Sequence, residues 1–202
     1  MKTAQDTEFL ELAARSGCIG LFIGLESIDD TSLAEINKKQ KLAEYEEIIK
    51  TIHSYKINIL GSFIFGFDND NKTVFERTLD FSRKNKLTAI QINVLMPFPG
   101  TDLYRKLKKA NRLLSNEWWM AGPSGYYDMP FEPERLSKED IKKGSIWVAK
   151  QFYSLGSIAA RAFSQCNKSV AGLQVYSILN FGYRNLLSSY PLDKGFHPCK
   201  IQ

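Results

Sequence analysis

The fold is decided by the stretch INILGSFIFGFDND, residues 57–70, a long apolar run that follows Lys56 and ends in an Asp/Asn-rich turn. An apolar run without polar alternation is typical of a strand that is buried on both faces, as in parallel sheets. Helical patterns precede and follow it. Gly66, Phe67 and Asp68 therefore fall where a parallel strand opens into the loop that carries sites in α/β folds.

Two more strands are expected around this one, at CIGLFIGLES (18–27) and TAIQINVLM (88–96). Apolar residues at helical spacing predict a helix before, between and after the strands. This order describes successive βα units, hence a parallel sheet with right-handed crossovers. The expected helices run from the N-cap Asp6 to Gly17, from a capping box at Ser32-x-x-Glu35, and over 43–55, 72–84 and 102–111.

Each expected strand carries small or polar residues on one face. A polar face shared by neighbouring strands favours the inside of a barrel over a flat doubly wound sheet, in which helices would cover both faces. Three parallel strands alone leave bare edges, so the chain is expected to start in the middle of a domain. A partner chain, an upstream segment or the C-terminal region would then cover the edge. The residues of the polar face are Gly20, Gly24, Glu26, Ser62, Gly66, Gln91 and Asn93.

The composition changes near Leu114, where aromatic residues, Gly and Pro become frequent. We therefore expect a half-barrel over 1–113 and an aromatic loop with a helical extension over 114–202. The loop NEWWMAGPSGYYDMPFEP is suited to cover the mouth of a barrel. One long helix is then expected from Ser137 to about Phe163, with residues that include Leu155 turned inward, and a second over 169–187.

Composition places the chain among ordinary globular proteins, with 202 residues, 12% aromatic residues and a net charge of +5. Lysines mixed with glutamates favour solvated helix faces over a nucleic-acid interface, so no nucleic-acid partner is expected. The apolar stretch 169–187 contains too many polar residues for a membrane span. Three widely spaced cysteines, Cys18, Cys166 and Cys199, favour a reduced cytoplasm over a disulfide framework or a metal site.

Few residues carry recognisable chemistry. Glu26 is either a site carboxylate or a solvated strand-end acid, and Asp68, with its Asn/Asp neighbours, favours turn and helix-cap chemistry over catalysis. The Gly66 backbone is suited to close approach of a ligand. PFPGT, residues 97–101, is a plain turn or a shelf for a ligand. No role is assigned to His53 or His197.

Three motifs in this order resemble the radical SAM superfamily, particularly its cobalamin-binding-domain-associated branch. In that family the core is a partial TIM barrel of six βα units, so the resemblance implies its second half followed by a helical C-terminal extension. The motifs are GLFIGLESIDDTSLAEINKKQ (20–40), GSFIFGFDNDNKTVFERTLDF (61–81) and INVLMPFPGTDLYRKL (92–107), and WVAKQFYSLGSI (147–158) is similar to the extension.

The resemblance also implies a binding site for S-adenosyl-L-methionine (SAM). Glu26 and Ser27 would lie near the ribose and methionyl group, and Lys38 or Lys39 near the carboxylate. Ser62 to Gly66 would pass the adenine, and the backbone of Asn93 to Pro97 would touch the same base. The implied cofactor-binding residues are Glu26, Ser27, Lys39, Ser62, Gly66, Asn93, Met96 and Pro97.

The sequence departs from the family because the C-x-x-x-C-x-x-C motif that holds a 4Fe–4S cluster is absent. The three cysteines are too widely spaced to replace it. We therefore expect a fragment of a radical SAM enzyme that is inactive alone and acts, with its N-terminal half or a cluster-bearing partner chain, by radical or cobalamin-assisted methyl chemistry on an unknown small molecule. The alternatives are a non-catalytic adaptor that docks through an open sheet edge and a basic nucleic-acid-binding domain.

Overall fold

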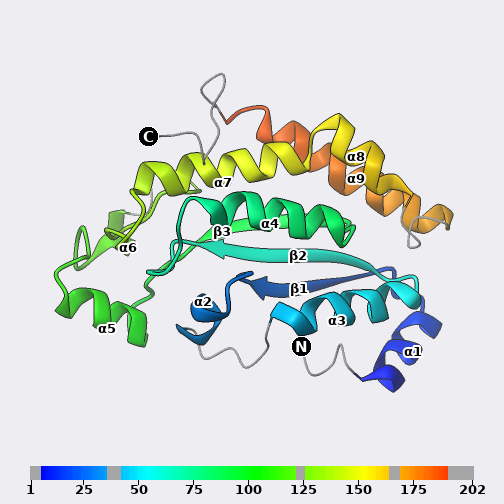
Figure 1. Cartoon of the computed structure of the whole chain (residues 1–202), viewed down its shortest axis with the longest axis horizontal. Coiled ribbons are helices and arrows are strands. Elements are labelled where there is room, and N and C mark those ends of the chain that lie inside the picture. The colour runs from blue at the N-terminus through cyan, green and yellow to red at the C-terminus, as the bar shows by residue number, and fades with distance from the viewer. Residues whose placement is uncertain (1–5, 36–41, 122–125, 164–168, 191–202) are drawn as a thin grey trace.

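The computed structural model describes residues 6–35, 42–121, 126–163 and 169–190. Three parallel strands, β1 (Gly20–Glu26), β2 (Asn58–Phe65) and β3 (Ala89–Val94), form one sheet in the order β1-β2-β3 (Figure 1). The helices are α1 (Thr7–Arg15), α2 (Asp30–Glu35), α3 (Leu42–Ser54), α4 (Thr73–Lys84), α5 (Asp102–Lys109), α6 (Trp118–Ala121), α7 (Lys138–Phe152), α8 (Leu155–Ala162) and α9 (Val170–Leu187).

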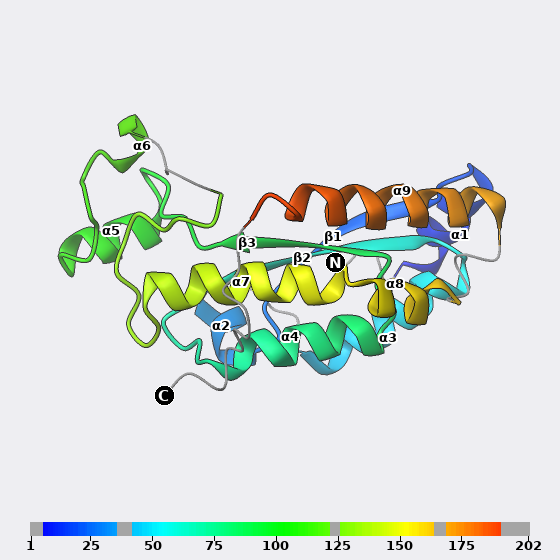
Figure 2. The same ribbon diagram turned by 90° about the horizontal axis from the view of Figure 1, so that it is seen from above.

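The two faces of the sheet differ sharply. Residues such as Ile59 and Phe63, both fully buried, line the face beneath the helices, whereas Phe22 on the other face of β1 is 62% exposed. Seen from above, α3, α4 and α7 lie on one side of the strands and α9 on the other (Figure 2). The predicted fold class is confirmed: an α/β chain with a three-stranded parallel sheet and a helical extension, consistent with a partial barrel.

The predicted helix starts are set by local capping. Asp6 precedes α1 and its carboxylate accepts the Phe9 N–H at 3.0 Å. Ser137 does the same for α7 through the Asp140 N–H. Such caps satisfy backbone donors that have no partner within the helix. Gly17 follows α1 with a φ of +86°, the conformation expected of a residue that terminates a helix.

The prediction of a single long helix up to Phe163 is wrong, because the helix ends at Phe152 and a second one follows. Ser154 lies in extended conformation and its hydroxyl accepts the Ser157 N–H, which starts α8 as a separate helix. The break turns Leu155 outward, with 59% of its surface exposed, against the prediction of an inward residue. A serine that can cap a new helix thus overrode the apolar periodicity.

The capping box expected at Ser32 is also wrong. Asp29 accepts the N–H groups of Thr31 and Ser32 at the start of α2, so the helix begins earlier. Ser32 is fully buried inside α2, and its hydroxyl donates to Asp70 of the loop after β2 at 3.3 Å. This long-range contact ties together the loops that follow β1 and β2.

The helical extension is locked to the amino end of β3 by a buried arginine. Arg161 of α8 is 2% exposed and donates to the carbonyls of Leu87 and Phe152 and to the side chain of Asn180. Its guanidinium lies 3.6 Å from the centre of the Phe152 ring. Asn180 of α9 donates in turn to the Thr88 carbonyl. Helices α8 and α9 are therefore fixed to the amino end of β3.

α9 packs against the rest of the chain along one side only, through Gly172, Tyr176, Asn180 and Leu187. Of the helices that the structure describes, none combines the length and apolar character needed to cross a membrane.

Candidate functional site

The carboxyl ends of the three strands meet at one edge of the sheet. The register aligns Gly24 with Ser62 and Ser62 with Gln91, so the three residues form one row across the strands. Two residues further along the strands, Ile64 lies beside Asn93, and the Leu95 N–H donates to the Phe65 carbonyl. Side chains on the open face of β2 and β3 are therefore neighbours at this edge.

Asn93 is the centre of a polar network on this open face. Its amide nitrogen donates to the Ser62 hydroxyl at 2.9 Å, and its amide oxygen accepts from Gln91 at 3.1 Å and from the Tyr126 hydroxyl at 2.8 Å. Gln91 also donates to the Tyr126 hydroxyl. Asn93 and Gln91 are half-buried and Tyr126 is 51% exposed, so solvent reaches this part of the network, whereas Ser62 is 7% exposed.

Glu26 ends β1 in an unusual backbone conformation, with a φ of +67°. The Ser27 N–H donates to the Leu25 carbonyl at 2.9 Å, which closes a tight turn around Glu26. The Glu26 carboxylate folds over Gly24, where an added Cβ would lie only 2.2 Å from Glu26 Oε1. A glycine at position 24 thus makes room for the carboxylate above the open row.

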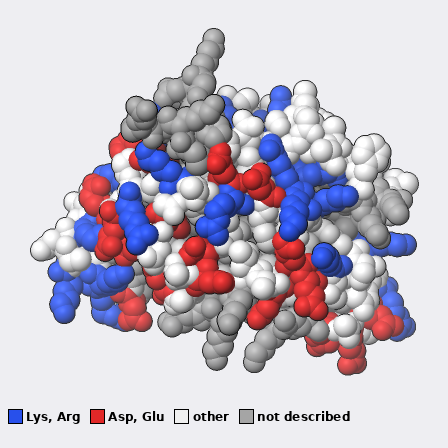
Figure 3. All heavy atoms as spheres, in the orientation of Figure 1, with Lys and Arg blue, Asp and Glu red and all other residues white. Residues whose placement is uncertain are grey.

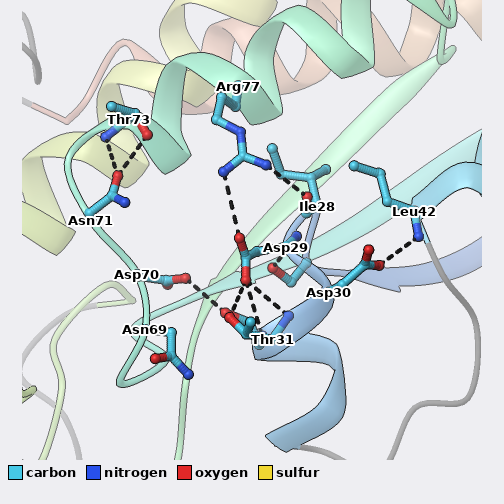
Figure 4. A network of polar contacts seen from close by, with 12 residues as sticks. Ile28, Asp29, Asp30, Thr31, Leu42, Asn69, Asp70, Asn71, Thr73 and Arg77 are labelled. Carbon is cyan, nitrogen blue, oxygen red and sulfur yellow. Dashed lines mark hydrogen bonds and ion pairs between the residues drawn. The ribbon is translucent and has the colours of Figure 1, made fainter.

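Ser27 differs from Glu26 because its side chain serves the turn. Ser27 is 3% exposed, and its hydroxyl accepts the Asp29 N–H at 3.1 Å. Arg77 of α4 holds the same turn, since it reaches the Ile28 carbonyl at 3.2 Å and the Asp29 carboxylate at 3.6 Å (Figure 4). The loop after β1 is therefore held both by its own residue Ser27 and by Arg77 of α4.

The loop after β2 is shaped by Gly66 and Asp70. Gly66 has a φ of +109°, and its N–H and that of Phe67 donate to Asp70 Oδ2 at 2.8 and 3.1 Å. Asp70 is 3% exposed; burial raises the pKa of its carboxyl to about 6, against the lowering effect of these hydrogen bonds. Met129 covers Gly66 so closely that an added Cβ would lie 2.5 Å from Met129 Cε. The close approach expected at Gly66 is thus made by this methionine.

Asp68 lies in the predicted turn, but its carboxylate forms ion pairs instead of a helix cap. Its carboxylate pairs with Arg112 at 2.6 Å and with Lys106 of α5 at 2.7 Å. Burial raises its pKa, but the hydrogen bonds from these two cations outweigh burial and leave the pKa below the ordinary value. Arg112 also donates to the Glu132 carbonyl at 2.8 Å. Asn71 of the same Asn/Asp-rich turn accepts from the Thr73 N–H at the start of α4, whose N-cap residue is Lys72.

The segment after β3 closes the edge. Met96 is half-buried and Pro97 is buried, and the Pro97 carbonyl accepts from Trp118 Nε1 at 3.2 Å. The aromatic loop therefore does pack at the carboxyl end of the sheet. The remaining expected residues, Lys38 and Lys39, lie outside the described residues.

The structure thus brings Glu26, Ser62 and Asn93 to one open face and places Ser27, Gly66 and Pro97 in the loops that support it. Sequence reasoning missed Tyr126 and Arg112. Asp70 is expected to serve the turn together with its Asn/Asp neighbours, and its carboxylate does so by accepting the Gly66 and Phe67 N–H groups. Tyr126 and Arg112 act across the chain and carry no local signal.

Residues for a metal centre are scarce here. Within the described ranges, no group of three or more His, Cys, Asp or Glu side chains is placed to hold a metal ion. Cys18, the free cysteine in those ranges, lies beside β1 at its amino end. The described residues therefore do not fit an iron–sulfur cluster, which needs clustered thiolates.

Charge is distributed without a dominant sign on the surface that Figure 3 displays, where basic and acidic side chains are interspersed. Several of the lysines pair with carboxylates, for example Lys84 with Glu46 and Lys142 with Asp128. Interspersed charge is typical of solvated helix faces.

Comparison with known proteins finds methyltransferases. The chain is 35% identical over 162 residues to a bacteriochlorophyllide d C-12(1)-methyltransferase of Chlorobaculum tepidum, which covers 80% of this chain and 34% of the relative. It is 24% identical to a hopanoid C-2 methylase of Rhodopseudomonas palustris, over 77% of this chain and 37% of the relative. A bacteriochlorophyllide d C-8(2)-methyltransferase of Chlorobaculum tepidum is 25% identical over 56% of the chain and 26% of the relative.

The chain therefore spans about a third of the length of the relatives it matches best among these. No family model matches it.

Proposed function

We propose that this chain is the SAM-binding part of a radical SAM methylase, with cobalamin-assisted methyl transfer in the complete protein. The single observation that carries the proposal is the convergence of Glu26, Ser62 and Asn93 on one open face at the carboxyl edge of a parallel sheet. Similarity to three enzymes named as methyltransferases or methylases supports it. In parallel α/β folds ligands bind at this edge.

The open row supplies the groups that SAM would need. Ser62, Gln91 and Asn93 present hydroxyl and amide groups that can hydrogen-bond to a base or a ribose, and Glu26 supplies a carboxylate. The Glu26 carboxylate occupies the place above Gly24, directly beside the row. SAM bound there would supply the methyl group, while these residues bind and orient it.

The iron–sulfur cluster would be held elsewhere, since the described residues do not fit it. We infer that an N-terminal half or a cluster-bearing partner chain supplies it, and that this chain by itself is inactive. The open face with the exposed Phe22 is suited to such a complement, because large apolar side chains in water favour burial. We also propose that the SAM-binding half-barrel spans residues 1–113 and that the aromatic loop and helical extension span residues 114–202.

Binding of SAM is tested by titrating the isotope-labelled chain to millimolar SAM and following the side-chain amide signals by NMR. We expect saturating shifts of the Asn93 and Gln91 amides. Asn180, fully buried at the amino end of β3, is the internal control and should not shift. Asn93→Ala should weaken binding about tenfold, the effect of about 1.4 kcal/mol. The exposed Asn185→Ala variant is the matched control.

The proposal fails if the Asn93 amide is unmoved by SAM, or if Asn180 shifts as much as Asn93. Methyl transfer by the complete protein is a separate claim, tested by transfer of label from methyl-labelled SAM.

A second candidate function is a non-catalytic adaptor that docks through its open sheet. The exposed Phe22 on the uncovered face favours it as well. Size-exclusion chromatography of the chain with candidate partners distinguishes the two. A stable heteromer in which the Asn93 amide no longer responds to SAM would support the adaptor; SAM binding that persists or improves in the heteromer would support the methylase.

A further inference from the structure

A cavity lies beside the open row, between the outer edge of β3, the end of α7 and α9. Its volume is about 250 Å³. Tyrosines from the aromatic loop, α7, α9 and the residues after α9 line it; we call it the tyrosine pocket. They are Tyr126, Tyr127, Tyr153, Tyr183 and Tyr190.

The rings of the tyrosine pocket are held in fixed orientations. Tyr153 and Tyr183 are stacked, with centroids 5.1 Å apart and planes 12° apart, whereas Tyr127 meets Tyr126 and Tyr190 edge to face. The Tyr153 hydroxyl accepts the Ile90 N–H at 2.9 Å and donates to the Ile90 carbonyl at 2.7 Å. That hydroxyl takes the place of a neighbouring strand at the edge of the sheet, so the ring cannot turn away.

The chemistry of the lining suits an uncharged ligand with rings. No Asp, Glu, Lys or Arg is found among the described residues that line the pocket. Burial raises the pKa of Tyr127, Tyr153 and Tyr183, so their hydroxyls stay neutral. Aromatic walls favour stacked or edge-on contact with another ring. A cavity of about 150 Å³ can hold benzene, so the volume here is enough for a larger ring system or one end of it.

The tyrosine pocket adjoins the candidate SAM site. Gln91 and Tyr126 line the pocket and also belong to the network around Asn93. Ile92, between Gln91 and Asn93 along β3, lines it as well. Strand residues alternate in the direction of their N–H and C=O groups, so the Ile92 peptide groups point outward like those bonded to Tyr153 at Ile90. They offer a donor and an acceptor to a polar atom on the ligand.

We propose that the tyrosine pocket binds an uncharged, apolar ring portion of the methyl acceptor and holds it next to the SAM site. The identification of the ligand as the acceptor rests on the proposed function, whereas the binding of an apolar ring does not. Tyr126 lies between the two sites. Its ring lines the tyrosine pocket and its hydroxyl donates to Asn93, so it can contact both ligands.

The probe is 2-naphthol, an uncharged bicyclic ring with one hydroxyl, titrated into the chain by calorimetry with 2-naphthalenesulfonate as its charged counterpart. We expect one saturable site for 2-naphthol and at least tenfold weaker binding of the sulfonate. Tyr183→Leu, which removes the stacked wall, should weaken 2-naphthol about tenfold. Tyr104→Leu, on α5 away from the pocket, is the control and should change nothing.

A second pair of variants avoids damage to the core. Leu186 and Leu173 both lie on α9 and are 59% and 48% exposed, but Leu186 alone of the two lines the pocket. Leu186→Asp places a charge at the pocket and should weaken 2-naphthol about tenfold, whereas Leu173→Asp should not. Equal effects of the two variants, equal binding of the sulfonate, or no saturable site would overturn the proposal.

The outcome is separate from that of the SAM experiment. Binding of 2-naphthol without any response to SAM would retain the tyrosine pocket and overturn the methylase. A response to SAM without binding of 2-naphthol would overturn the pocket alone.

Discussion

The two ends of the sheet use the same kinds of polar side chain for opposite purposes. At the amino end, Arg161 and Asn180 bond to backbone carbonyls and are at most 2% exposed. At the carboxyl end, Gln91 and Asn93 bond mainly to each other, to Ser62 and to the exposed Tyr126. A closed network of this kind holds elements together, whereas an open one can exchange its partners for those of a ligand.

The difference shows how to separate a structural network from a site. A buried donor or acceptor that loses its partner costs about 1–3 kcal/mol, so a closed network tolerates little change. A half-buried amide can bond to water instead, and its loss is felt mainly in binding. The two ends of the sheet should therefore respond differently to substitution.

The largest effect is expected from Arg161→Met. The change leaves the carbonyls of Leu87 and Phe152 and the Asn180 side chain without their donors. The free energy of unfolding should fall by about 3–5 kcal/mol, measured by urea denaturation. Arg105→Met is the control, because Arg105 pairs with Asp102 in solvent and its loss should stay within about 0.5 kcal/mol. If Arg161→Met lowers the free energy of unfolding no more than Arg105→Met does, then Arg161 does not hold the extension on the sheet.

The next effect is a pair of opposing pH dependences. Burial raises the folded-state pKa of Asp70 from 3.8 to about 6, so its stabilising contribution is complete below 3.8 and is lost as the pH rises to about 6. Burial lowers the pKa of His53, assisted by Lys86, from 6.5 to about 4, so its contribution is complete above 6.5 and is lost as the pH falls to about 4. Between these limits the two contributions oppose each other.

Asp70→Asn should therefore leave a stability that rises with pH between about 4 and 6.5, and His53→Gln one that falls with pH between about 4 and 6. Each slope should amount to no more than about 3 kcal/mol over its window. Urea denaturation at closely spaced pH values measures both. Parallel slopes in the two variants would show that burial does not shift these pKa values as described.

A smaller loss is expected from Gly66→Ala. The backbone at a φ of +109° is strained for any residue with a Cβ, and that Cβ would meet Met129. The free energy of unfolding should fall by about 2 kcal/mol. Gly182→Ala, in α9 with nothing within 4 Å, should instead be neutral or stabilising by up to about 1 kcal/mol. If both variants behave alike, the loop after β2 is not fixed by Gly66.

The smallest effect on stability is expected from Gly24→Ala. The new Cβ would displace only the flexible end of Glu26, so unfolding should change by less than about 0.5 kcal/mol. If Glu26 contacts SAM, the same change should weaken the SAM-dependent shift of Asn93 several-fold, measured by NMR. A stable Gly24→Ala variant with unaltered SAM binding would remove Glu26 from the site.

Much of the architecture could be predicted from the sequence. The apolar stretch 57–70 and its two companions are long, and a period of two on one face distinguishes the open side from the covered side. The caps at Asp6 and Ser137 follow from side chains that reach their own backbone within three residues. Such signals are local, so they survive without knowledge of the fold.

The failures share a different cause. The helix break at Tyr153 and Ser154 places Tyr153 against β3, where its hydroxyl bonds to Ile90. Ser32 lies inside α2 because Asp29 starts the helix earlier, and the Ser32 hydroxyl then donates to Asp70, 38 residues away. In both cases a competing local cap starts the helix, and a distant partner that no short window of sequence contains then holds the residue in place.

By itself the sequence determined three parallel strands, the helices between them and the polar character of one face, because backbone sterics and apolar periodicity act over a few residues. Only the tertiary structure decided that Tyr126 meets Asn93, that Asp68 binds Arg112, and that five tyrosines enclose a pocket beside the open row. Those contacts depend on packing between segments that are distant in the chain, and packing is decided by the shape and burial of the whole molecule.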